Sequence, residues 1–372
     1  MNVVALILAG GNGARLHPLT VEHAKPALPF AAGYRIIDFV LSNLVNSRIT
    51  SIYVLAQYKP QSLIEHIRTA WAPWSGGPDA RITVVLPRTD AEGGKFKGTA
   101  DAVYRNLDII DRHRADLVAV FAADHVYRMD VRQMVRFHQE RDADACVAAL
   151  PVPIERASAF GIVATGPGDE LRDFREKPER PPPMPTDPSR AYASMGNYLF
   201  NAGVLVELLE AANRRGDTDF GHHILPRLTH SRRVFAYDFS GNDVPGVQPH
   251  EERGYWRDIG TIAAYEAAQR DASGKLPRFD LVNPHWPIRG GDIGVGTAIP
   301  EDQHSGEGRS DPPQANRAGT TRAAGQGKVP AAKARAVMAG TPAAFAKRAR
   351  LRKEDRRSPT LLRTRKFATA QH

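Results

Sequence analysis

Short, uninterrupted apolar runs that alternate with helix-like segments are the feature that most restricts how this chain can fold. Runs rich in Val, Ile and Leu occupy residues 3–9, 51–56, 81–86, 117–122 and 145–151. Between them, residues 35–46, 60–71, 99–112 and 131–141 carry apolar side chains at helical spacing. Strands that are apolar on both faces are typical of parallel sheets covered by helices on each side. Residues 1–150 therefore predict an α/β fold, which binds ligands at the carboxyl ends of its strands.

Beyond residue 151 the alternation is looser. We expect strands over 160–164, 171–176 and 195–200, and helices over 203–214 and 258–271. The proline-rich segment 178–188 predicts an extended surface loop. From residue 291 onward Ala, Gly, Arg and Pro dominate without a sustained period, which predicts a disordered or weakly structured tail with a candidate helix over 335–357.

Composition excludes several classes of protein. With 42% hydrophobic and 24% charged residues, the chain can bury a core. The net charge of +9 resides in the tail, where 16 Lys and Arg face 7 Asp and Glu. No nucleic-acid-binding motif accompanies these charges, so we expect no nucleic-acid partner. The sequence has no apolar run long enough to span a membrane and no secretory signal, and the single Cys146 suits a reducing cytoplasm.

A glycine-rich turn directly follows the first predicted strand. Residues 8–16 are Leu-Ala-Gly-Gly-Asn-Gly-Ala-Arg-Leu. Glycines there let backbone N–H groups approach a phosphate, and Arg15 adds positive charge. The spacing fits neither the P-loop nor the dinucleotide fingerprint. Lys25 is a second candidate phosphate cation. The alternatives are a structural turn and a solvated lysine.

Two acidic residues are candidate metal ligands. Asp124 follows the apolar run 117–122, so its carboxylate comes at the end of a strand. Mg²⁺ is commonly held by one or two carboxylates together with substrate phosphates. Asp258 follows Tyr255-Trp256-Arg257 and can complete the same site, while helix N-capping is the alternative for both residues. We interpret His125 as a structural or supporting residue rather than a base.

A third motif, Glu176-Lys177-Pro178, ends the strand predicted over 171–176. A lysine fixed by the following proline can meet a sugar phosphate as a point charge. The alternative is a surface ion pair between Glu176 and Lys177.

Together these motifs resemble those of the bacterial glucose-1-phosphate adenylyltransferases, or ADP-glucose pyrophosphorylases. The blocks 34–39 and 193–198 favour this family over thymidylyl- and guanylyltransferases, which share the glycine loop. The resemblance covers residues 3–289 in order. It is carried by residues 8–16, 18–20, 24–30, 34–39, 41–43, 98–103, 124–127, 159–161, 176–178, 193–198, 219–221, 255–261 and 283–289.

The resemblance implies a Rossmann-like nucleotidyltransferase domain with a mixed, mostly parallel sheet. Such enzymes join ATP and α-D-glucose 1-phosphate, with Mg²⁺, to give ADP-glucose and pyrophosphate for glycogen synthesis. We assign the catalytic domain to residues 1–275, the start of a connection to 276–290 and the basic tail to 291–372. The family's left-handed β-helix, which builds its homotetramer and part of its allosteric site, is not evident after Gly290.

The same resemblance assigns each candidate residue a role. Arg15, Lys25 and Asp124 are the expected catalytic residues, and Asp124 and Asp258 are the expected Mg²⁺ ligands. Backbone and side chains at Leu8, Ala9, Gly10, Gly11 and Gly98 are expected to border the nucleotide. The sugar phosphate is expected to contact Phe96, Gly161, Glu176, Lys177 and Ser194.

Three departures from the family pattern bear on activity. Ala31-Ala32 replaces a Gly-Gly pair, which predicts a strained turn with positive φ. Arg105 stands where the family has Gln, and Phe96 stands where it has a Tyr that contacts the sugar phosphate. The alternatives to ADP-glucose synthesis are therefore another NDP-sugar pyrophosphorylase and a weakly active or inactive member.

Overall fold

A computed structural model describes residues 1–31, 33–71, 81–88 and 94–291 of this chain. The expectations for Ala32 and for the tail after Gly291 fall outside these described residues.

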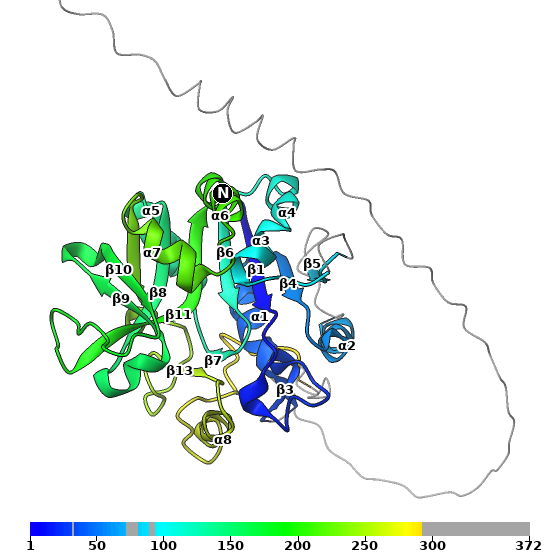
Figure 1. The fold of residues 1–372 in the computed structure, drawn as a ribbon. Coiled ribbons are helices and arrows are strands. Elements are labelled where there is room, and N and C mark those ends of the chain that lie inside the picture. Colours follow the sequence, from blue (N-terminus) through cyan, green and yellow to red (C-terminus); the bar gives the residue numbers. More distant parts are fainter. Residues whose placement is uncertain (32, 72–80, 89–93, 292–372) are drawn as a thin grey trace, which may run out of the picture. The chain divides into compact units, whose positions relative to one another are not determined.

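In the described residues the main sheet has nine strands, in the order β10-β9-β11-β6-β1-β4-β5, with β8 joined through β11 and β12 joined through β8 (Figure 1). Four neighbouring strands are parallel: β6 (Leu117–Ala122), β1 (Val3–Ala9), β4 (Ser51–Ala56) and β5 (Arg81–Val85). β11 (Arg190–Asn201) runs antiparallel to β6, so the sheet is mixed. The other strands of this sheet are β8 (Ala145–Pro153), β9 (Gly161–Thr165), β10 (Leu171–Glu176) and β12 (Val234–Asp238).

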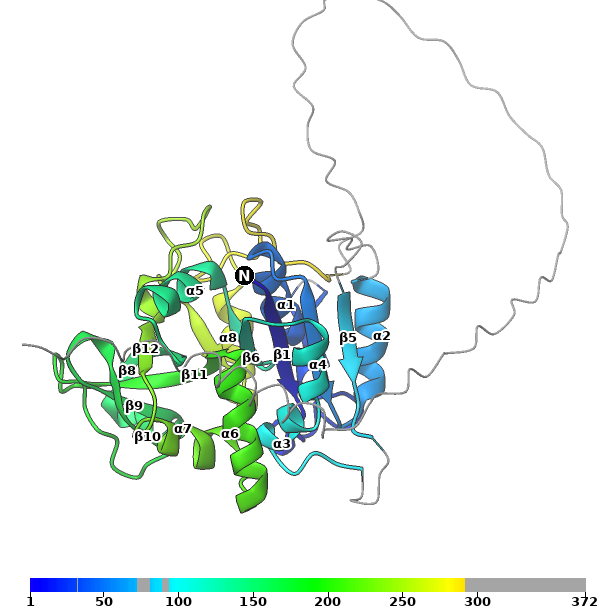
Figure 2. The same cartoon turned by 90° about the horizontal axis from the view of Figure 1, so that it is seen from above.

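Helices cover both faces of this sheet (Figure 2). Along β1, Val4 and Leu6 enter one apolar cluster, whereas Ala5 and Ile7 enter a second. Burial of both faces explains why the strands of the parallel half are apolar without interruption. The first cluster includes residues of α3 (Thr99–Tyr104), α4 (Leu107–Arg112), α6 (Ala202–Arg215) and α7 (Leu225–Leu228). The second includes residues of α1 (Ile36–Asn46), α2 (Pro60–Ala70) and α5 (Val131–Glu140).

A smaller apolar cluster lies beyond the carboxyl ends of the parallel strands (Figure 1). Phe39 of α1, Val126 and Phe279 are among its buried members. Two short antiparallel pairs contribute to it, β2 (Pro29–Phe30) with β3 (Tyr34–Arg35), and β7 (His125–Tyr127) with β13 (Trp256–Asp258). Helix α8 (Ile262–Asp271) supplies its last buried helical residue, Ala268. This cluster supports the loops at the edge of the sheet where ligands are expected.

Three predicted elements differ in the structure. The helix predicted over 99–112 is two helices, because the Asn106 side chain donates to the Ala102 carbonyl (2.8 Å) and its backbone leaves the helical region. The strand predicted over 195–200 already begins at Arg190. The helix predicted from 258 begins at Ile262, because Asp258 still belongs to β13.

Two further expectations, for the segment 178–188 and for Ala31, agree with the structure. The segment 178–188 contains no helix or strand. Ala31 has φ of 45°, in the left-handed region, as the replacement of Gly by Ala predicted. Within the described part of the chain, no helix combines the length and the apolar character needed to cross a bilayer.

Candidate active site

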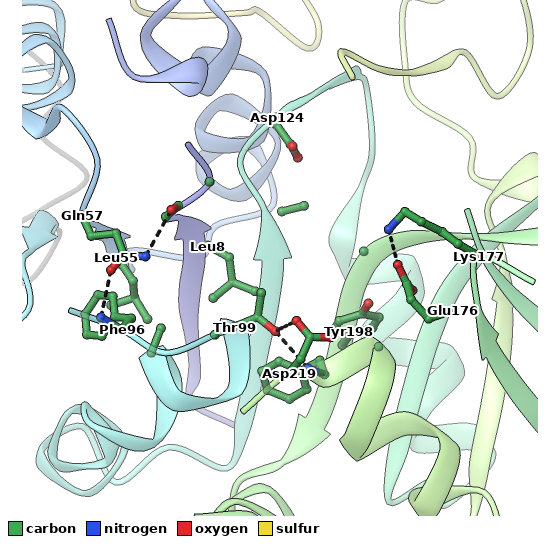
Figure 3. A pocket seen from close by; sticks show the side chains of 18 residues that line it. Leu8, Leu55, Gln57, Phe96, Thr99, Asp124, Glu176, Lys177, Tyr198 and Asp219 are labelled. Atoms are coloured by element: carbon green, nitrogen blue, oxygen red, sulfur yellow. Dashed lines mark hydrogen bonds and ion pairs between the residues drawn. The ribbon is translucent and has the colours of Figure 1, made fainter. Parts of the chain in front are cut away.

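A cavity of about 400 Å³ opens where the parallel strands β1, β4 and β6 end. In Figure 3, Asp124 lies at one end of this cavity, with Phe96 on one side and Lys177 on the opposite side. The cavity is lined by Leu8, Gly10, Gly11, Leu55, Gln57, Phe96, Gly98, Thr99, Ala102, Ala122, Asp124, Glu176, Lys177, Gly196, Tyr198, Asp219, Phe220 and Gly221.

Asp124 and Asp258 converge beside the cavity. Asp124 directly precedes β7 and Asp258 ends β13. The antiparallel pairing of these strands sets Asp258 opposite His125, and the Ile259 N–H donates to the Asp124 carbonyl (3.2 Å). One ligand atom from each of Asp124, His125 and Asp258 lies within 4.8 Å of the others. Carboxylate oxygens are the ligands that Mg²⁺ prefers, so this metal cluster (Asp124, His125 and Asp258) can hold a divalent cation.

Lys25 lies between the two carboxylates. Its Nζ is 2.6 Å from Asp124 Oδ2 and 3.6 Å from Asp258 Oδ1, and the residue is 8% exposed. A short 3₁₀ turn, Lys25–Ala27, holds the backbone there, and the Arg35 guanidinium donates to the Ala27 carbonyl (3.2 Å). Lys25 is therefore buried and paired in the structure, rather than a solvated surface lysine.

Asp124 is held in its ionised form. Burial by itself raises the pKa of its carboxyl group, but His125, Lys25 and the hydrogen bond from Lys25 outweigh burial and lower the pKa to about 2. The side chain keeps 33% exposure, so water also solvates its charge. Asp124 is thus suited to bind a cation and unsuited to donate a proton near neutral pH.

The glycine-rich turn after β1 borders the cavity through Gly10 and Gly11. Gly13 has φ of 63°, and a Cβ there would lie 2.8 Å from Thr20 Cγ2, so glycine is required at this position. Thr20 donates to the Gly13 carbonyl (3.0 Å) and Gln57 donates to the Gly10 carbonyl (3.3 Å). Nothing lies within 4 Å of a Cβ built on Gly11. The backbone at this turn is therefore braced and open to a ligand.

Two residues of the predicted nucleotide site do not line the cavity. The side chain of Ala9 packs in the apolar cluster with α1. Arg15 is exposed. A Cβ built on Gly260 would lie 3.5 Å from a terminal nitrogen of Arg15 and would also lie close to Asp258 Oδ2. Arg15 therefore lies near the metal cluster.

Glu176 and Lys177 lie across the cavity from Phe96 and form an ion pair with each other (Figure 3). The Glu176 carboxylate fits against two glycine backbones, because a Cβ would lie 2.9 Å from its Oε2 at Gly161 and 2.6 Å from it at Gly221. Lys177 has φ of 45° and a half-exposed side chain. An acceptor and a cation side by side suit a ligand that carries hydroxyl groups and a phosphate.

Asp219 completes this side of the cavity. Its Oδ2 accepts a hydrogen bond from Thr99 Oγ1 (2.9 Å), and its Oδ1 accepts from the His222 N–H (3.0 Å). Its own N–H donates to His223 Nδ1 (3.1 Å). These bonds fix a second carboxylate near Glu176, where a sugar hydroxyl can donate to either.

The loop 94–98 forms the opposite side. Phe96 is buried, and its N–H donates to Gln57 Oε1 (2.8 Å). Gly98 touches the backbone of Thr218, where a Cβ would lie 2.4 Å from the carbonyl oxygen. Arg105 lies 5.8 Å from the centre of the Phe96 ring and donates to the Lys95 carbonyl (2.9 Å). The position that departs from the family pattern therefore braces this loop.

A bulge in β11 shapes the wall between these two sides. The register with β8 shifts between Ser194 and Tyr198, and Gly196 inside the bulge has φ of 68°. Gly196 and Tyr198 line the cavity, whereas Ser194 is buried behind them, and its Oγ accepts from the Gly196 N–H (3.2 Å). Ser194 and Gly161 are not among the residues that line the cavity, so their contacts with the sugar phosphate stay predictions.

The N-capping alternatives are wrong for both predicted metal ligands. Helix α5 is capped by Asp130, which accepts from the Arg132 N–H (2.9 Å), and Asp124 lies on the far side of β7. Helix α8 is capped by Thr261, which accepts from the Ala264 N–H (3.1 Å). Both carboxylates are therefore left to face Lys25 and each other.

Sequence reasoning overlooked several side chains that line the cavity. Gln57 and Thr99 could have been found from their positions, one directly after β4 and one at the start of α3. Asp219 belongs to a motif that carried the family resemblance but received no role. Tyr198 gives no local signal, because only the bulge at Gly196 directs it to the cavity.

Comparison with known proteins agrees with this geometry. Residues 4–274 match the nucleotidyl transferase family. The glucose-1-phosphate adenylyltransferase of Thermodesulfovibrio yellowstonii is 52% identical over 287 residues, which are 77% of this chain and 70% of that protein. The enzymes of that name from Thermus thermophilus and Mycobacterium tuberculosis are 47% and 46% identical, over 78% of this chain and 71% and 72% of their own lengths. With this similarity running through the whole described fold, the chain belongs to the glucose-1-phosphate adenylyltransferase family of nucleotidyl transferases.

Proposed function

We propose that this chain transfers the adenylyl group of ATP to α-D-glucose 1-phosphate, which gives ADP-glucose and pyrophosphate for α-glucan synthesis. The observation that carries the proposal is the convergence of Asp124, Asp258 and Lys25 at one end of a cavity whose other side carries Glu176, Lys177 and Asp219. The first group suits a polyphosphate, and the second suits a phosphorylated sugar.

In this reaction a phosphate oxygen of the sugar phosphate attacks the α-phosphorus of ATP in line, and the bond to the β-phosphate oxygen breaks. Both reactants are anions and no covalent protein nucleophile is needed, so catalysis depends on positioning and on charge. Arg15 and Lys25 have the charge to bind the triphosphate, and Gly10 and Gly11 offer a backbone that a phosphate can approach.

Asp124 and Asp258 are the proposed Mg²⁺ ligands, and the donor set fits, since two carboxylates from segments far apart in the sequence lie close together. Bound Mg²⁺ supplies charge neutralisation and a template for the phosphates. Lys25 balances the two carboxylates, and its ammonium group is proposed to bind the substrate phosphates as well.

On the sugar side, Glu176 and Asp219 are proposed to accept hydrogen bonds from glucose hydroxyls. Lys177 is proposed to bind the phosphate of the sugar. Phe96 is proposed to border the substrate with its ring in place of the usual tyrosine. These assignments rest on the lining of the cavity and on the fixed positions of the two carboxylates.

The test is an assay of the purified protein with Mg²⁺, glucose 1-phosphate and, in parallel reactions, ATP, dTTP, UTP and GTP. ADP-glucose formed from ATP at a rate well above the other nucleotides supports the proposal. A higher rate with another nucleotide identifies a different NDP-sugar pyrophosphorylase. Background pyrophosphate release from folded protein with all four nucleotides identifies an inactive member.

We also predict that the protein is cytoplasmic. The one cysteine, Cys146, is buried and unpaired, as is common in a reducing cytoplasm. The family's homotetramer is tested by light scattering on the full chain, and a monomer would contradict it.

A further inference from the structure

The strand that carries the metal cluster has little support from the main sheet. β7 spans three residues and pairs only with β13, which also spans three, in a separate two-stranded sheet of the described fold. Two-stranded pairs are marginal by themselves. The distance between Asp124, before β7, and Asp258, at the end of β13, therefore depends on what fastens this pair to the rest of the domain.

Asn43 of α1 is one such fastening. It is completely buried, and its Nδ2 donates to the carbonyl of Tyr127, the last residue of β7 (3.1 Å). Its Oδ1 accepts from the N–H of Met129 two residues later (3.0 Å). The side-chain amide of Asn43 thus forms hydrogen bonds with the backbone of the last residue of β7 and with the backbone just after this strand. Among uncharged side chains of this size only an amide supplies a fixed donor and a fixed acceptor together.

A third segment meets the same side chain. We call residues 283–290 the strap. Trp286 of the strap donates its indole N–H to Asn43 Oδ1 (3.3 Å). The strap is also bonded to the neighbouring positions of α1, from the Arg289 N–H to Ser42 Oγ (2.8 Å) and from Asn46 Nδ2 to the Pro287 carbonyl (3.0 Å). Of these three α1 residues, Asn43 has hydrogen bonds with both the strap and β7.

We infer that Asn43 is a positioning residue for the metal cluster, and that the hydrogen bond from Trp286 to Asn43 couples the strap to the affinity of the cluster for a divalent cation. The inference rests on the proposed cation site at Asp124 and Asp258. Loss of the amide lets β7 shift relative to α1, and the two carboxylates then separate. The strap acts through the same oxygen, because Trp286 and Met129 both donate to Asn43 Oδ1.

Direct Mn²⁺ binding, measured by electron paramagnetic resonance on the full chain without nucleotide, tests this inference. Residues that support metal ligands typically contribute 10- to 100-fold to affinity, so we expect Asn43→Ala to raise the Kd for Mn²⁺ by about 10-fold. Trp286→Phe removes one donor and keeps an aromatic ring, and we expect a rise of about 3-fold, below that range because the Tyr127 and Met129 bonds persist. The matched control is Asn46→Ala, which removes a strap bond of the same kind with no link to β7 and should leave the Kd unchanged.

Kinetics supply a second readout. We expect Asn43→Ala to lower kcat at limiting Mg²⁺, to recover with excess Mg²⁺ and to keep its KM for glucose 1-phosphate, because Glu176 ends β10 and Lys177 follows it, in a segment separate from β7. A merely structural role would lower thermal stability without moving the Kd for Mn²⁺.

The outcomes separate the two proposals. Absence of Mn²⁺ binding by the wild-type protein contradicts the cation site of the proposed function. Wild-type binding that is unchanged in folded Asn43→Ala, or equally weakened in Asn46→Ala, overturns the positioning role of Asn43. If Asn43→Ala does not fold, Trp286→Phe decides, and an unchanged Kd in that variant overturns the coupling.

Discussion

Charge balance among a few side chains dominates the chemistry of this site. Two carboxylates, Asp124 and Asp258, face one ammonium group, Lys25, at 2.6 and 3.6 Å. Their ion pairs with Lys25 hold the two carboxylates close together. An arrangement of this kind can exchange one cation for another with little movement of the backbone.

We predict that Asp124→Asn lowers kcat by about 100- to 1000-fold, the range found when one charge-stabilising group is removed from an active site. The amide keeps the shape of the carboxylate but loses its charge for the cation. The thermal midpoint should change little, because Lys25 keeps Asp258 as a partner. Steady-state kinetics and thermal melts measure the two effects.

The control for that variant is Asp142→Asn. Asp142 is an exposed carboxylate paired with Arg233 away from the cavity, and its side chain is 86% exposed. Rates near wild type are expected. Wild-type rates in Asp124→Asn itself would remove Asp124 from the mechanism.

Lys177→Ala should raise the KM for glucose 1-phosphate by about 10- to 100-fold and the KM for ATP far less. A hydrogen bond to a charged group contributes about 1.5–3 kcal/mol, which corresponds to this range. Arg175→Ala is the matched control, since Arg175 is a cation of β10, two residues before Lys177, and pairs with Asp173. Equal increases in both KM values would contradict the proposed place of Lys177 on the sugar phosphate.

At the scale of elements, backbone contacts decide where the polar groups lie. The turn after β1 is fixed by Gly13, the wall of the cavity by the bulge at Gly196, and the Glu176 carboxylate by glycines on two other segments. β9 begins at Gly161, and a π-helical turn, Phe220–Ile224, contains Gly221. The position of Glu176 in the cavity thus depends on close contacts between separate elements.

Gly221→Ala tests this dependence. The new Cβ would lie 2.6 Å from Glu176 Oε2, which is the far end of a flexible side chain, so Glu176 must move while the fold is retained. We expect a higher KM for glucose 1-phosphate and a loss of stability below about 1 kcal/mol. Gly203→Ala in α6 is the control, because nothing lies within 4 Å of its Cβ and alanine favours helices by up to about 1 kcal/mol. An unchanged KM in Gly221→Ala would show that the position of Glu176 is unimportant for binding.

Element boundaries show which parts of the fold can be read locally. The strands over 3–9, 51–56 and 117–122 coincide with β1, β4 and β6, because a buried parallel strand is a continuous apolar run. β7, β12 and β13 were not predicted. β7 and β13 have three residues each, too few for a periodic pattern, and their pairing joins residues far apart in the chain.

At the scale of the whole molecule, stability should depend on pH through His138. Burial lowers the pKa of this histidine, and the hydrogen bond to Asn201 and the nearby Asp144 and Asp142 oppose that effect only partly. Asn201 donates through its Nδ2 to the Ala143 carbonyl, so its Oδ1 accepts from His138 Nε2, and the buried Nδ1 carries no proton in the neutral ring. Protonation of Nδ1 would place a donor in the interior without a partner.

The lowered pKa of His138 determines whether the free energy of unfolding rises or falls with pH. Below its ordinary value of 6.5, the unfolded chain binds a proton that the folded chain does not. The contribution of His138 is therefore complete above pH 6.5 and is lost as the pH falls through the lowered pKa of the folded state. We expect the free energy of unfolding to fall with a slope of at most about 1.4 kcal/mol per pH unit from this residue.

Urea unfolding at several pH values measures the slope. His138→Gln should remove its part of the pH dependence, whereas His250→Gln, at an exposed position, should not. An identical slope in His138→Gln and the wild-type protein would contradict the assignment.

The sequence by itself determined the class of fold, the family and the edge of the sheet where the site lies, because buried parallel strands and glycine turns leave local patterns. It also supplied eight of the eighteen residues that line the cavity, including Gly10, Gly11, Phe96, Asp124 and Lys177. Only the tertiary structure decided that Lys25 joins Asp124 to Asp258, that Asp219 lines the cavity and that Ser194 does not. These relations depend on the pairing of β7 with β13 and on a bulge in β11, and long-range pairing of this kind has no periodic trace in the chain.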